Sequence, residues 1–92
     1  MLSPAYLFEV ITMRFQITMN MPARSGSAVH QIIGDHPAKD LEELVHIISS
    51  SDFIIVDELY KDNDPQRGLG FFSAGNIAIN PLFIGKIKVM QL

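Results

Sequence analysis

The chain has no cysteine and no tryptophan among its 92 residues, and only 18% of its side chains are charged. The lack of cysteine excludes disulfide bridges, thiolate zinc sites and cysteine nucleophiles. It also fits a reducing compartment, so we expect a cytoplasmic protein. The formal net charge of −3 suffices for solubility and argues against non-specific binding to nucleic acid.

Long hydrophobic runs are also lacking. The apolar run over residues 5–11 is interrupted by Glu9, and no Lys or Arg precedes it. Such a run is a poor signal peptide and is too short to span a membrane, so we expect no membrane association. We expect one domain over residues 1–92, and the sequence leaves open whether residues 1–12 belong to its fold or are an appended segment.

The clearest pattern in the chain is a strict alternation of apolar and polar side chains over residues 13–21. This period of two predicts a strand with one buried face. Pro22 should end the strand, residues 22–26 should form a loop, and residues 28–33 should form a second strand. The apolar positions of the first strand are Met13, Phe15, Ile17, Met19 and Met21.

Residues 34–37 should break the sheet, and a helix is predicted to follow them. Asp40 can cap its first turn by accepting the amide of Glu43, and Glu43 can reach back to the cap. The serines at 49–51 should end the helix, because their hydroxyls compete for backbone hydrogen bonds. One apolar helical face is formed by Leu41, Leu44, Val45 and Ile48, with Ile47 on its flank.

The second half of the chain reads as three further strands. Residues 53–56 form a continuous apolar run, which predicts a strand covered on both faces. Residues 61–68 contain no apolar side chain and should form a solvated loop. Extended structure should resume at residues 71–72, and a turn at residues 75–76 should precede a strand over residues 77–79.

A single helical turn is expected near Pro81, because proline suits the first position of a helix. We expect this turn to tuck Leu82 and Ile84 under the sheet. Residues 86–89 then form the last strand, with its two lysines directed outward.

These elements predict an α+β fold, a mostly antiparallel sheet of four to five strands with one helix in the order ββαβββ. One helix covers only part of one sheet face. The remaining apolar side chains need cover either from curling of the sheet into a partial barrel or from a second subunit. The predicted core comprises Phe15, Ile17, Leu44, Val45, Ile48, Ile55, Ile77 and Val89.

No residue pattern predicts a catalytic or metal site. His30, His36 and His46 match no spaced zinc motif. Asp62 and Asp64 resemble the start of a calcium loop, but the glycine and the glutamate that such a loop requires are missing. Residues 68–70 lack the helix and the Lys-Ser/Thr pair of a phosphate-binding loop. We therefore expect no cofactor, no metal and no enzymatic activity.

The leading functional hypothesis is a small non-enzymatic interaction or assembly protein that acts as a homo-oligomer. It rests on the small size, the 48% apolar content and five methionines, which suit adaptable contact surfaces. The alternative is a β-rich module that binds single-stranded nucleic acid through cations and stacking aromatic rings. Its contact residues would be Arg14, Lys86, Lys88, Phe71 and Phe72.

Overall fold

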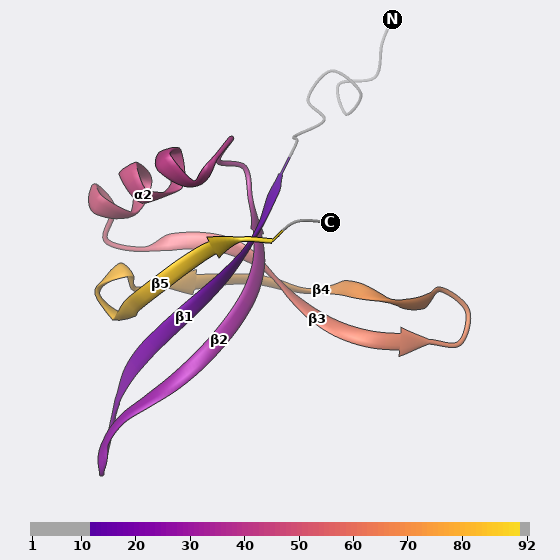
Figure 1. The fold of residues 1–92 in the computed structure, drawn as a ribbon, viewed down its shortest axis with the longest axis horizontal. Coiled ribbons are helices and arrows are strands. Elements are labelled where there is room, and N and C mark those ends of the chain that lie inside the picture. Colours follow the sequence, from indigo (N-terminus) through magenta and orange to yellow (C-terminus); the bar gives the residue numbers. More distant parts are fainter. Residues whose placement is uncertain (1–11, 91–92) are drawn as a thin grey trace, which may run out of the picture.

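The computed structural model of the protein describes residues 12–90, which form one antiparallel sheet with an α-helix packed on one face (Figure 1). This architecture confirms the fold class and the ββαβββ order predicted from the sequence. Within residues 12–90, no helix is long and apolar enough to cross a membrane. The elements are β1 (Met13–Ala23), β2 (Gly26–His36), α2 (Leu41–Ser49), β3 (Ile54–Asp64), β4 (Gly68–Ile79), the 3-10 turn η1 (Pro81–Phe83) and β5 (Ile84–Val89).

The sheet is curled, because a short link joins its two opposite edges. The strand order is β4-β3-β2-β1-β5, so β4 and β5 are the edge strands, yet only residues 80–83 connect them. A flat sheet of five strands would hold its edges about 19 Å apart. The link includes the 3-10 turn, which rises only about 2 Å per residue and cannot span that distance. The helix lies on the concave face, and the sheet stays open because β4 and β5 do not pair.

The two hairpins of the sheet diverge from a short shared segment. The β1–β2 and β3–β4 hairpins each pair along their whole length. In contrast, β2 pairs with β3 only over residues 33–35 and 57–59. Beyond this segment the hairpin tips point in different directions (Figure 1). Residues 26–32 of β2 and 60–64 of β3 therefore each have one strand edge without a partner among residues 12–90.

The core lies between the concave face and α2. Phe15, Ile17 and Leu44 are almost fully buried, which confirms the predicted phase of β1 and one predicted helix position. Ile48, Ile77 and Val89 are partly buried against the same cluster. The buried members of the cluster are Phe15, Ile17, Met19, Ala38, Leu44, Ile54, Val56 and Ile79.

The prediction that Ile55 is buried, in a strand covered on both faces, is wrong. Ile54 and Val56 face the helix and are buried, whereas Ile55 points to the convex face and is 56% exposed. That face carries no second layer of structure among residues 12–90, so a run of apolar residues there does not imply cover on both sides.

The predicted core position of Val45 is also wrong. Val45 is exposed, and Ile47 packs against the core together with Leu41, Leu44 and Ile48. Val45 and Ile47 each lie three or four residues from a core residue of the helix. Sequence spacing alone therefore cannot tell which of the two faces the core. The packing surface of the curled sheet selects the side that carries Ile47.

Both ends of α2 follow the prediction. The Asp40 side chain accepts the Glu43 amide at 2.8 Å, which confirms the N-cap. The Glu43 carboxylate accepts the amide of Lys39 at 3.3 Å, one residue before the cap. At the other end, the hydroxyls of Ser49 and Ser50 both donate to the carbonyl of His46.

The strands of both hairpins are longer than predicted. Pro22 does not end β1, because β5 pairs with β1 only as far as Met19 and the proline therefore lies on an open edge. Residues 61–64 are not loop but pair with the first residues of β4. Asp64 closes that hairpin by accepting the amides of Gln66 and Arg67, and these two bonds lower the pKa of its carboxyl group.

Two glycines that suggested breaks lie within strands. Gly75, at φ +105°, marks a bulge at which Glu58 and Leu59 face Gly75 and Ser73. Gly34 lies inside β2, which continues to His36. A Cβ atom at Gly34 would lie 3.0 Å from Cγ2 of Val56. The absence of a side chain at Gly34 lets β3 approach β2 closely. The prediction that this residue breaks the sheet is wrong.

The contrast between neighbouring isoleucines of β3 gives a direct test of this strand phase. We expect Ile54→Ala to lower the free energy of unfolding by about 2–5 kcal/mol, because it removes buried methyl groups and leaves a cavity. Ile55→Ala should cost less than about 1 kcal/mol, as is usual for an exposed position. Urea denaturation of both variants measures the difference. Equal costs would show that Ile55 is buried and that this phase is wrong.

Candidate interaction surface

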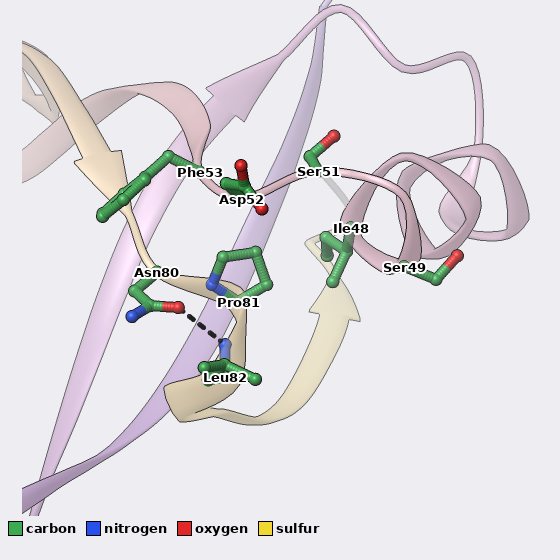
Figure 2. Close-up of a pocket in the computed structure, with 8 residues that line it drawn as sticks. All are labelled: Ile48, Ser49, Ser51, Asp52, Phe53, Asn80, Pro81 and Leu82. Carbon is green, nitrogen blue, oxygen red and sulfur yellow. Dashed lines mark hydrogen bonds between the residues drawn. The ribbon is translucent and has the colours of Figure 1, made fainter.

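A hollow of about 540 Å³ lies between the C-terminal end of α2 and η1 (Figure 2). Ile48 lies on its helix side, and Pro81 and Leu82 lie on the side of η1. We call this space the helix-end hollow. Its lining residues are Ile48, Ser49, Ser51, Asp52, Phe53, Asn80, Pro81 and Leu82.

The turn η1 holds Leu82 outward. The side chain of Asn80 accepts the Leu82 amide at 3.1 Å, and Pro81 occupies the first position of the turn. Phe83 and Ile84 pack against the core, so they take the inward positions. Leu82 is consequently 87% exposed, and the expectation that it lies under the sheet is wrong.

A second hollow, of about 710 Å³, lies on the concave face beyond the reach of the helix. We call it the concave hollow. The nine residues of α2 span only about 14 Å, so they leave the part of this face near the β1–β2 tip uncovered. Phe53 and Asn80 line both hollows, so the two adjoin each other at these residues. The other lining residues are Met19, Met21, Pro22, His30, Ile32, Ile77, Ala78, Ile79 and Phe83.

Arg14 and Phe71, two residues of the alternative nucleic-acid interpretation, lie together on the convex face. The guanidinium carbon of Arg14 lies 5.3 Å from the centroid of the Phe71 ring. The same guanidinium donates to both carboxylate oxygens of Asp35, at 3.0 and 3.2 Å. The charge of Arg14 is thus already paired within the chain.

The remaining residues of that interpretation fall on both faces. Lys86 and Lys88 lie opposite Thr18 and Gln16 on the convex face and are exposed. Phe72 lies on the other face, where its ring is 5.9 Å from that of Tyr60 and 4.1 Å from the Arg67 guanidinium carbon. The convex face therefore gathers four of the five residues and leaves Phe72 out.

Carboxylates also occupy the convex face. Asp35 and Asp57 lie opposite one another across β2 and β3. The hydroxyl of Ser73 donates to Asp57 at 2.5 Å. The face thus carries acidic and basic side chains together. Within residues 12–90, no group of three His, Asp or Glu side chains is placed to hold a metal ion.

Each histidine has a distinct environment. His36 is buried, and its Nδ1 atom accepts the Ala38 amide at 2.9 Å. Burial lowers the pKa of His36, and the negative charge of Glu43 opposes part of this shift. His30 lines the concave hollow, and His46 is exposed on α2. The structural contact of His36 accounts for this residue without a ligand.

Comparison with known proteins adds no relative. No protein-family model matches the chain, no curated protein matches it, and no solved structure matches it. The helix-end hollow was not predicted from the sequence, because Phe53 and Leu82, which both line it, come from segments predicted to be buried.

The buried imidazole makes stability depend on pH. Because the folded-state pKa of His36 lies below its ordinary value of 6.5, the unfolded chain binds the proton more readily. We therefore expect the free energy of unfolding to fall as pH drops through about 6.5. In His36→Asn, whose amide oxygen can still accept the Ala38 amide, this loss should be smaller. Denaturation between pH 7.5 and 5 measures it, and an unchanged slope in the variant would contradict the assignment.

Proposed function

We propose that this chain is a non-enzymatic interaction protein that assembles with further copies of itself. The observation that carries the proposal is the exposed Leu82, held on the capped turn η1 beside the helix-end hollow. Exposed apolar side chains grouped around a hollow are typical of protein contact sites. The lack of cysteine in the whole chain supports a reducing compartment such as the cytoplasm as the place of action.

A second copy is the partner that this surface suits best. Leu82 protrudes, and the hollow next to it is lined by the apolar side chains of Ile48, Phe53 and Pro81. A surface that carries both a protruding side chain and a hollow can pair with itself about a two-fold axis. Each copy then inserts its leucine into the hollow of the other, as an isologous contact requires.

The chemistry around the hollow supports a protein contact rather than a reaction site. Its centre is apolar, and its rim carries Ser49, Ser51 and Asp52. An apolar centre with a polar rim is the usual arrangement of protein interfaces. Among residues 12–90, Asp52 is the only ionisable side chain that lines the hollow, so these residues place no acid–base pair there.

Leu82 and Leu69 provide a matched pair of variants. Leu69 is also exposed, at 69%, but lies on the β3–β4 hairpin away from either hollow. We expect Leu82→Ser to lower the mass of the oligomer measured by light scattering at micromolar concentration, because it removes the apolar anchor. Leu69→Ser should leave the mass unchanged. A wild-type monomer at all concentrations, or equal behaviour of the two variants, would contradict the proposal.

Single-stranded nucleic acid is the second candidate ligand, and the Arg14–Phe71 contact beside Lys86 and Lys88 favours it. If this alternative holds, a labelled oligonucleotide should bind with an affinity that falls as salt rises, because lysine–phosphate contacts release counterions. The double variant Lys86→Gln/Lys88→Gln should weaken binding and flatten the salt dependence. Absence of binding at low salt would exclude this function.

A further inference from the structure

The strand edges of this sheet are protected unequally. β5 is only six residues long and carries Lys86 and Lys88. β4 contains a bulge and several glycines, and the open part of β3 carries Lys61, Asp62 and Asp64. β1 beyond Met19 contains Pro22. Short length, charge, bulges and proline are the features that prevent a strand edge from pairing with another chain.

Residues 27–31 of β2 form a short open segment that has no charge, bulge or proline. The segment reads Ser-Ala-Val-His-Gln, with no Lys, Arg, Asp, Glu, Pro or Gly, and Val29 is 63% exposed. It lies where β2 has separated from β3 and has no partner on that side among residues 12–90. A regular, uncharged and open strand edge is a template for the addition of another strand.

The hydrogen-bond phase of the sheet identifies which residues face this edge. The Met90 amide donates to the Arg14 carbonyl at 2.8 Å, so even-numbered residues of β1 bond toward β5. Odd-numbered residues of β1 then bond toward the even-numbered residues of β2 with which they pair. The odd-numbered residues of β2, namely Ser27, Val29 and Gln31, therefore direct their amides and carbonyls to the open edge.

We propose that residues 27–31 pair with the same residues of a second copy, antiparallel about a two-fold axis at Val29. In this register Ser27 lies opposite Gln31 of the other copy, and Val29 lies opposite its own counterpart. All three outward-facing residues thus find hydrogen-bonding partners. The pairing ends just before Ile33, which is already paired with Leu59 of β3.

The side chains of this register suit a second copy. Residues opposite each other on antiparallel strands must project from the same face. Val29 would meet the β-branched side chain of its counterpart on the convex face, and Ala28 would meet His30 on the concave face. No like charges are brought together. A second copy therefore meets this open segment with matched side chains on both faces and with all three outward-facing residues bonded.

This contact goes beyond the proposed function, because it uses a different surface from the helix-end hollow. The β2 edge and Leu82 lie on different elements, since Leu82 belongs to the turn η1. A chain that pairs through both has two distinct two-fold contacts. Such a chain builds a closed tetramer if the two axes intersect at right angles, and an extended chain of subunits if they do not intersect.

Engineered cysteines test the register directly, because the chain has no cysteine of its own. In Val29→Cys, the two introduced residues would lie about 5.5 Å apart between Cα atoms, within the range of a disulfide bond. We expect rapid and nearly complete covalent dimer formation under mild oxidation. Ser27→Cys alone should not cross-link, because its counterpart lies about 14 Å away. A mixture of Ser27→Cys with Gln31→Cys should cross-link.

Matched charge variants give an independent readout. Val29→Lys places a charge on the open edge, whereas Asn20→Lys places one on the neighbouring strand opposite Val29. We expect only Val29→Lys to lower the mass of the oligomer in solution. An oligomeric wild type whose Val29→Cys variant cross-links no faster than Ser27→Cys would overturn the edge pairing and leave the Leu82 surface standing. A monomeric wild type without cross-linking would overturn both.

Discussion

The rest of this structure depends on the short connection between the opposite edges of the sheet. Residues 80–83 must carry the chain from the end of β4 to the start of β5, although three strands lie between them. Curling of the sheet brings its two edges within reach of this short link. The curl turns the face of β1 that carries Phe15 and Ile17 into a concave interior. It therefore fixes which side chains form the core before any contact of the helix is considered.

The same curl explains why apolar surface remains exposed. A curled sheet needs a cover as long as its concave face, and α2 has only nine residues. The helix covers the end at Phe15 and leaves the end at Met21 open. The connection itself stands at the boundary between the covered and uncovered parts, so the tight turn that closes the topology also presents Leu82 to solvent. The exposure of Leu82 therefore follows from the short β4–β5 connection in which it lies.

Sequence alone predicted those features that depend on neighbours in the chain. The alternation in β1, the Asp40 cap and the proline-led turn at Pro81 are all local, and all are confirmed. Features that depend on where distant strands meet were missed. The exposure of Ile55 requires knowledge that the convex face has no cover, and the role of Gly34 depends on the crossing of β3. Neither hollow nor the open β2 edge could be predicted, because each arises where separate segments part.

The size of the two contact surfaces indicates how they would act together. Stable interfaces usually bury about 1,600 Å², and pairing of five residues along a strand edge buries much less. Edge pairing contributes directional hydrogen bonds, but each is worth only about 1 kcal/mol after the loss of bonds to water. Burial of Leu82 adds affinity that the β2 edge lacks. Pairing along the β2 edge in turn fixes the relative position of the two subunits, which a single leucine cannot specify. Each contact alone is weak. An assembly that uses both has a higher overall affinity, because the two sites are linked within one subunit.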